Sequence, residues 1–133
     1  MTYYTYAFEK LEIWQLGRAL KKRMYQISAS FPKHELYGLS SQLRRSAASI
    51  TANIAEGSGR ATQADRAYFL NMAYASGLEV LDHLTTAYDL EYIAEEEYGS
   101  VRIELDKLLN KLNAFYKYTI NAKESLKSKM KKT

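Results

Sequence analysis

Apolar residues recur at alternating spacings of three and four residues along four separate segments of this chain, and this period constrains the fold more than any other feature. Such spacing places side chains on one face of an α-helix, whereas a strand requires a period of two. The segments cover residues about 8–30, 35–57, 62–89 and 95–121. The sequence therefore predicts an all-α protein with four long amphipathic helices.

The predicted core consists of the apolar positions that share a face within each segment. The first two segments contribute Ile13, Gly17, Leu20, Met24, Ile27, Phe31, Leu36, Leu39, Leu43, Ala47, Ile50 and Ile54. The last two contribute Leu70, Tyr74, Gly77, Leu81, Leu84, Tyr88, Tyr98, Val101, Leu105, Leu108, Leu112, Phe115 and Thr119. The third segment carries a second semi-apolar face, which predicts burial on both sides, with Phe69, Met72, Ser76, Val80, His83 and Ala87.

Short breaks separate the four segments. Pro32 disfavours a helical conformation at the preceding residue and so ends the first helix. Gly57 or Gly59 can take the left-handed conformation that closes a helix, and Thr62 is a natural N-cap for the next one. Three short connections favour an antiparallel up-down-up-down four-helix bundle.

Length and composition restrict the class of protein. We expect residues 1–122 of the 133 to form a single domain and residues 123–133 to form a basic C-terminal tail. The absence of cysteine excludes disulfides, thiolate zinc sites and a cysteine nucleophile. The sequence has no signal-peptide pattern and no apolar run long enough to span a membrane, so we expect a cytoplasmic protein.

Charge is unevenly distributed along the chain. The net charge is +5 over residues 1–60, −5 over residues 61–122 and +4 over residues 123–133. Two interpretations remain open. The basic and acidic halves attract each other, within one fold or between subunits, or the basic half forms a surface for nucleic acid.

A stripe of polar residues follows the second predicted helix, on the face away from its main apolar row. Its members are spaced by four, three, four and three residues: Gln42, Ser46, Ser49, Asn53 and Glu56. Three interpretations are open: a subunit interface, a polar network inside the bundle that the third helix satisfies, and a ligand site. A lone Glu beside an Asn is a poor catalytic set, because acid–base chemistry usually needs a second titrating group or a metal.

No motif in the sequence predicts an enzyme, a cofactor or a metal. Glu79 and His83 are four residues apart, and neither histidine follows a Glu by three as di-iron bundles require. The glycine-rich stretch at Gly57 and Gly59 lacks the lysine of a phosphate-binding loop. Arg60 follows these glycines, which makes them a candidate anion site, and an ion pair from Arg60 to a carboxylate is the competing interpretation.

The candidate nucleic-acid contacts are the cations of the basic half and of the tail. They are Lys21, Lys22, Arg23, Arg44, Arg45, Lys127, Lys129, Lys131 and Lys132. Three tyrosines near the N-terminus, Tyr3, Tyr4 and Tyr6, have rings that can stack on bases. The alternative is that these charges are solvated helix faces.

The stretch "RRSAASITANIAEGSGR" resembles the family of 23S rRNA intervening-sequence proteins. The segments "FEKLEIWQLGRAL", "MYQISASFPKHELYGLSSQLRRSAASI" and "YFLNMAYASGLEVLDHLTTAYDLEYI" are similar to the same family, so that the resemblance covers about residues 8–118. Thr51 is a departure, because the family often has proline there. Threonine keeps the helix regular at this position.

The resemblance implies a four-helix bundle that assembles as a ring-like homopentamer. It supplies no catalytic residues and implies an association with ribosomal RNA genes. We therefore expect a non-enzymatic oligomer that binds RNA or DNA through repeated basic patches. The alternative is a protein-interaction scaffold or accessory subunit, with a protein partner and no affinity for nucleic acid.

Overall fold

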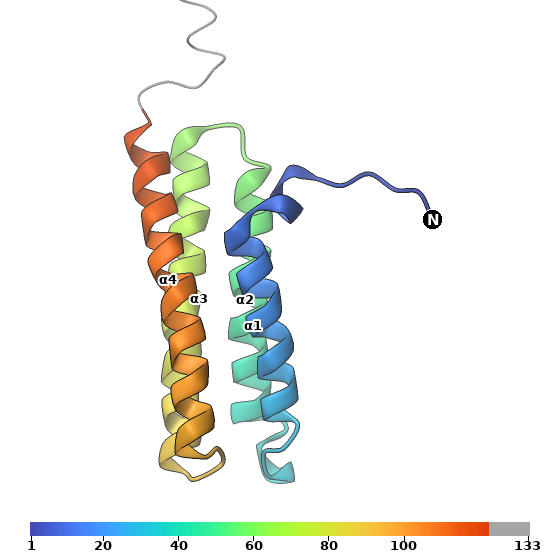
Figure 1. Ribbon diagram of the computed structural model, residues 1–133, viewed down its shortest axis with the longest axis vertical. Helices are drawn as coiled ribbons and strands as arrows, with labels where there is room; N and C mark the ends of the chain where they lie inside the picture. The colour runs from blue at the N-terminus through green and yellow to red at the C-terminus, as the bar shows by residue number, and fades with distance from the viewer. Residues whose placement is uncertain (123–133) are drawn as a thin grey trace, which may run out of the picture.

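Four α-helices run along one axis with neighbouring helices antiparallel (Figure 1). The computed structural model describes residues 1–122. Its helices are α1 (Glu12–Ser28), α2 (Leu39–Ser58), α3 (Gln63–Asp89) and α4 (Glu95–Asn121), with short 3-10 turns η1 (Ala7–Lys10) and η2 (Lys33–Glu35) before α1 and α2. This architecture confirms the predicted all-α four-helix bundle.

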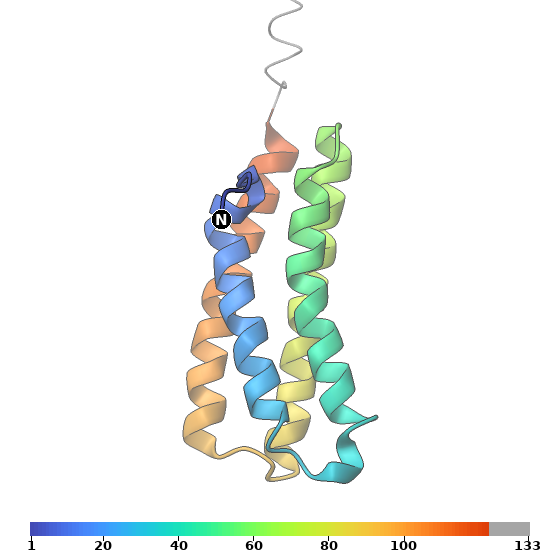
Figure 2. The same ribbon diagram turned by 90° about the vertical axis from the view of Figure 1, so that its right-hand side faces the viewer.

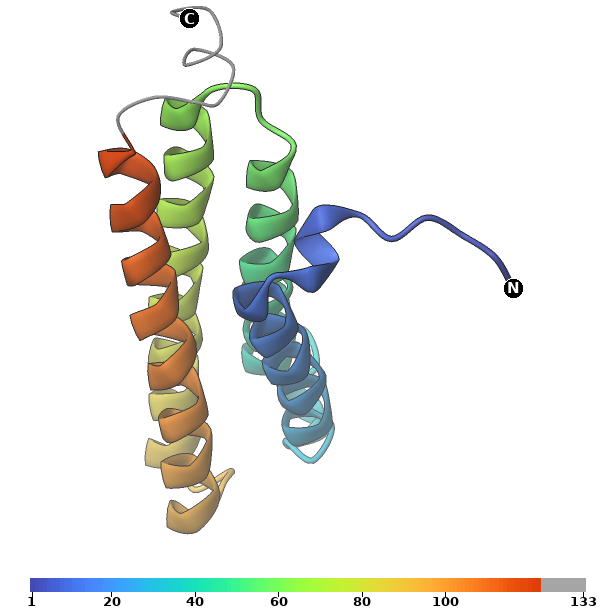
Figure 3. The ribbon, with the colours of Figure 1, turned by 45° about the horizontal axis from the view of Figure 1, so that its top comes forward.

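Around the axis of the bundle the helices follow in the order α1, α2, α3, α4, so each helix packs against those next to it in the chain (Figure 2). The contact between α2 and α3 is the most extensive, and that between α1 and α4 is the least. When the top of the bundle is brought forward, α1 and α2 form one pair and α3 and α4 another (Figure 3). The α2–α3 contact therefore holds the two pairs together.

The predicted apolar faces fill the interior. The large apolar side chains that are completely buried are Leu20, Met24, Leu43, Ile50, Ile54, Val80, Leu84, Val101, Leu105, Leu108 and Leu112. Each contributes about 1.5–3 kcal/mol relative to an exposed side chain. Leu36 is an exception and is half exposed, because it lies in the connection before α2.

The first helix is shorter than the predicted range of 8–30. Leu11 has an extended backbone (φ −70°, ψ 131°) and separates η1 from α1. The Glu9 carboxylate accepts the Tyr6 N–H at 2.7 Å, which closes η1 as a separate turn. The helical pattern of the sequence includes both elements, so it gives no sign of this break.

The second helix begins at Leu39 rather than at residue 35. Glu35 Oε1 accepts the Leu39 N–H at 3.2 Å, and Glu35 Oε2 accepts the Tyr92 hydroxyl proton at 2.9 Å. Glu35 thus satisfies a free N–H at the start of α2 from four residues upstream. It also ties the α1–α2 connection to the α3–α4 connection at the same end of the bundle.

Acid is expected to weaken this connection. The Leu39 N–H, and then the Tyr92 hydroxyl, hold the pKa of the Glu35 carboxyl below its ordinary value. A lowered folded-state pKa adds stability above the unfolded value, and this stability is lost as pH falls through the folded value. We expect the melting temperature of the wild type to fall more than that of Glu35→Gln from neutral pH to about pH 3. Asp106→Asn, at an exposed carboxylate, should follow the wild type; equal losses in Glu35→Gln and wild type would refute this role.

The expected left-handed glycine at the end of α2 is wrong. Gly59 has φ −89° and ψ −3°, and no glycine among residues 1–122 has a positive φ. The left-handed residue is instead Glu91 (φ 62°), after α3. Its N–H donates to the Tyr88 carbonyl at 3.0 Å, and the Tyr92 N–H donates to the Ala87 carbonyl at 2.8 Å. This is the pairing with which a glycine usually closes a helix.

The other helix boundaries follow simpler rules. Thr62 is the N-cap of α3, as expected, and its hydroxyl accepts the Asp65 N–H at 3.1 Å. Three glutamates occupy the first turn of α4, where they complement the helix dipole. Within residues 1–122, no helix combines the length and hydropathy that crossing a bilayer demands.

Candidate functional site

The polar stripe of α2 follows its contact with α3. The hydroxyls of Ser49 and Ser76 are 2.9 Å apart, which joins the two helices. Asn53 Nδ2 donates to the Ser49 carbonyl at 2.8 Å and to its hydroxyl at 3.0 Å. These bonds support a polar network within the bundle, the second of the three interpretations.

The stripe does not form one outward face. Ser46 is completely buried and donates its hydroxyl proton to the Leu43 carbonyl at 3.0 Å, inside its own helix. Gln42 is exposed and accepts from Arg45 Nη2 at 3.0 Å. Arg45 also pairs with Glu79 of α3 at 2.7 Å. Part of the stripe therefore lies in the core, contrary to the expectation that it faces away from the apolar row.

The stretch from Glu56 to Arg60 locks the end of α2 against α3. Arg60 pairs with Glu56 at 2.7 Å, and its guanidinium lies 4.6 Å from the centre of the Phe69 ring. Gly57 is buried, and a Cβ added there would lie 2.8 Å from the Phe69 Cβ. The glycine thus permits a close approach of the two helices, and Arg60 takes the ion pair that competed with an anion site.

Three of the candidate arginines form hydrogen bonds that connect helices at the surface of the bundle. Arg23 donates to Glu104 at 2.7 Å and to Ser100 at 3.0 Å, across the α1–α4 contact. Arg44 Nε donates to the Ser28 hydroxyl at 2.7 Å. Together with Arg45, these arginines connect helices, and their charges are partly neutralised or covered.

The other two candidates of the first helix lie on its exposed face and at its edge beside α2. Lys22 is exposed, and Lys21 Nζ donates to the Thr51 hydroxyl at 3.2 Å. Arg18 was not among the sequence candidates, although it is four residues before Lys22 and shares its helix face. We define the α1–α2 basic patch as Arg18, Lys21, Lys22 and Arg44. The candidates Lys127, Lys129, Lys131 and Lys132 lie outside the described residues.

The arginine of this patch on α2 also contacts an aromatic ring. The Arg44 guanidinium lies 5.2 Å from the centre of the Tyr25 ring, and Tyr25 is 46% exposed. At the N-terminus, Tyr3, Tyr4 and Tyr6 are all strongly exposed on a segment that leads away from the bundle (Figure 3). Exposed rings are therefore present near and beyond the basic patch.

Apolar side chains lie on the outside of α3. Tyr68 is 57%, Met72 39% and Leu78 46% exposed, and Ala75 is exposed between them. We call these four residues the α3 outer stripe. Of these four residues, only Met72 belonged to the predicted second face of the third helix. The stripe leaves α3 apolar on its outer as well as its inner side.

Glu79 of α3 has a partner other than His83, four residues later. Glu79 pairs with Arg45 rather than with His83, and His83 Nε2 is buried without a hydrogen-bond partner among residues 1–122. In the same part of the chain, no three His, Asp or Glu side chains come together as metal ligands.

Comparisons with known proteins identify the chain's relatives. The family model described as "23S rRNA-intervening sequence protein" matches residues 9–114. A crystal structure of a protein of unknown function from the S23 ribosomal protein family of Bacteroides thetaiotaomicron has the same fold, with a TM-score of 0.74 at 24% identity. The match covers 79% of this chain and 95% of that one. A search of curated proteins finds no match.

The matched range includes all of α1, α2 and α3 and most of α4. It also includes the polar stripe and the Glu56–Arg60 stretch, where the sequence resemblance is centred. The resemblance is thereby confirmed: the chain belongs to the 23S rRNA-intervening sequence protein family.

Proposed function

We propose that this protein is a non-catalytic subunit of a ring-like homopentamer, and that the α1–α2 basic patch, repeated around the ring, binds RNA or DNA. The single observation that carries the nucleic-acid part is the segregation of charge. Helix α1 contains four basic residues and one acidic residue, Glu12. Helix α3 contains four acidic residues and one basic residue, Arg66. Each subunit therefore has one basic and one acidic side.

The α3 outer stripe supports the oligomer. A helix that is apolar on both sides usually packs on both sides. Exposed Tyr68, Met72 and Leu78 on one helix form the kind of patch that marks a protein contact. Ring closure requires a heterologous contact between two different surfaces, so the α3 outer stripe would pack against a different surface of the neighbouring subunit, away from the α1–α2 basic patch.

Repetition compensates for a weak patch. Arg18 and Lys22 are exposed on one face of α1, and Lys21 and Arg44 lie at its edge beside α2. A single subunit would contact few phosphates, whereas a ring presents the patch several times to one polymer. The family description names 23S rRNA, which makes RNA the first polymer to test.

The test is fluorescence anisotropy with a labelled RNA and DNA pool at increasing salt. We expect Arg18→Gln/Lys22→Gln to weaken binding about tenfold and to lower the salt dependence by about two phosphate contacts. The matched control, Lys107→Gln/Lys117→Gln, removes two exposed charges from α4 and should bind as the wild type does. Binding that is insensitive to salt, or equal losses in the two double variants, would contradict the patch assignment.

A protein-only scaffold is the second candidate. It is favoured by Arg23 and Arg45, because each forms an ion pair within the same subunit, with Glu104 and Glu79 respectively. Size-exclusion chromatography with light scattering separates the candidates when it is run with and without nucleic acid. A stable oligomer that ignores the polymer would favour the scaffold, and a monomer would contradict the assembly shared by both.

A further inference from the structure

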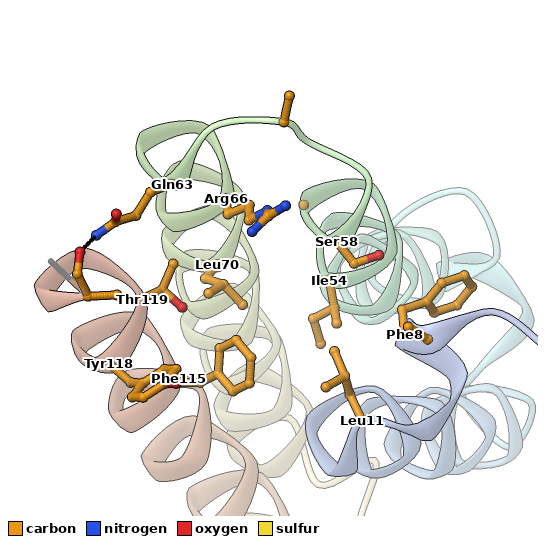
Figure 4. Close-up of a pocket in the computed structure, with 14 residues that line it drawn as sticks. Phe8, Leu11, Ile54, Ser58, Gln63, Arg66, Leu70, Phe115, Tyr118 and Thr119 are labelled. Carbon is orange, nitrogen blue, oxygen red and sulfur yellow. Dashed lines mark hydrogen bonds between the residues drawn. The ribbon is translucent and has the colours of Figure 1, made fainter. Parts of the chain in front are cut away.

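A cavity opens at the end of the bundle where α2 leads into α3 and where α4 ends (Figure 4). Its volume is about 390 Å³, within the range of small-molecule sites. It exists because α1 begins only at Glu12, while α4 continues to Asn121. At this level η1 and Leu11 take the place of a fourth helix and leave room between the two helix pairs.

The inner walls of the cavity are apolar and come from the segment before α1 and from α2, α3 and α4. Phe8 and Leu11 lie on one side, Ile54 on α2, Leu70 on α3 and Phe115 on α4 (Figure 4). Neither Gly57 nor Ala61 fills the space with a large side chain. An apolar body of moderate size would be buried by these walls.

The mouth of the cavity carries a cation. Arg66 lies at the mouth, and its Nε donates to the Arg60 carbonyl at 2.8 Å, which fixes the direction of its guanidinium (Figure 4). Among residues 1–122, Arg66 forms no ion pair, whereas Arg60 pairs with Glu56. Gln63 is also occupied, because its amide donates to the carbonyls of Ile120 and Ala122. The terminal nitrogens of Arg66 are thus the charged donors that this rim offers to a ligand.

We propose that the cavity binds a medium-chain monocarboxylate, with the apolar chain between the walls and the carboxylate on Arg66. A guanidinium binds a carboxylate through two parallel hydrogen bonds, and such charge-assisted bonds are stronger than neutral ones. The apolar walls select against small hydrophilic anions, because these would leave the walls uncovered. The proposed site includes no residue of the α1–α2 basic patch. The proposal therefore does not depend on nucleic-acid binding.

The experiment is isothermal titration calorimetry of the full-length protein with decanoate, with decanol as the uncharged probe and butyrate as the short anion. We expect one decanoate site per chain, with decanol and butyrate binding at least about tenfold more weakly. Arg66→Gln should weaken decanoate binding about tenfold or more and leave decanol binding unchanged. Arg102→Gln, near the other end of α4, is the matched loss of one arginine and should bind decanoate as the wild type does.

Chemical-shift changes locate the bound molecule. Decanoate should shift the methyl signals of Leu11, Ile54 and Leu70, which line the cavity, and leave those of Leu43 and Leu84 unchanged. The proposal is overturned if decanoate does not bind, if Arg66→Gln binds it as tightly as the wild type, or if decanol binds equally well. Shifts confined to residues outside the cavity would also overturn it.

Discussion

Gly57→Val is expected to destabilise the bundle by about 2–3 kcal/mol, the upper part of the range of about 1–3 kcal/mol for inserting bulk into a close-packed contact. The first atom added at Gly57 would lie 2.8 Å from the Phe69 Cβ and 3.6 Å from the Arg66 carbonyl oxygen. The contact with the Phe69 Cβ is too short, and this atom is fixed to the α3 backbone, so α2 and α3 must move apart. Thermal unfolding followed by circular dichroism at fixed protein concentration should show a melting temperature lower by about 10 °C.

A second glycine supplies the control. A Cβ at Gly99 of α4 would meet nothing within 4 Å. Gly99→Ala should therefore raise stability by about 0.5–1 kcal/mol, since alanine is the better helix former. If Gly57→Val were as stable as the wild type, the ends of α2 and α3 would not be held together as the structure describes. Loss of stability in both variants would point to a general intolerance instead.

Gly57 also shows where sequence reasoning stops. Its position at the end of an apolar run predicted a helix end correctly within two residues, because the helical period stops there. Its role was misjudged, because a glycine needed for a close approach and one needed for a left-handed turn look the same in a sequence. The distance to Phe69, twelve residues later, depends on how two helices pack.

The same limit explains the cations and the stripe. Periodicity placed Ser49 and Asn53 on one helix face, but only the packing of α3 brings Ser76 to Ser49. It likewise brings Glu104 to Arg23 over a separation of 81 residues, which turns a candidate nucleic-acid contact into a link between α1 and α4. Local period fixes which residues share a face. The partner of that face is set by the arrangement of the other helices.

Leu78→Asp is expected to convert the proposed pentamer into monomers without loss of helix. Leu78 lies on the α3 outer stripe and is 46% exposed, so its replacement leaves the core of the subunit intact. In the proposed ring this side chain is covered by a neighbour, and burying an unpaired carboxylate there costs several kcal/mol. Light scattering should show the mass falling from five subunits to the 15.3 kDa of one chain. Circular dichroism at low temperature should be unchanged.

Ile103→Asp makes the same kind of change outside the stripe. Ile103 is 75% exposed on α4, and the stripe is on α3, so this variant should keep the mass of the wild type. The pair therefore locates the interface as well as testing for it. Dissociation by Ile103→Asp alone would place the contact on α4, and a wild-type protein that is already monomeric would contradict the ring.

Because a monomer presents the basic patch once, Leu78→Asp should also weaken nucleic-acid binding, although it removes no positive charge. That coupled loss is the outcome by which avidity is distinguished from a strong single site.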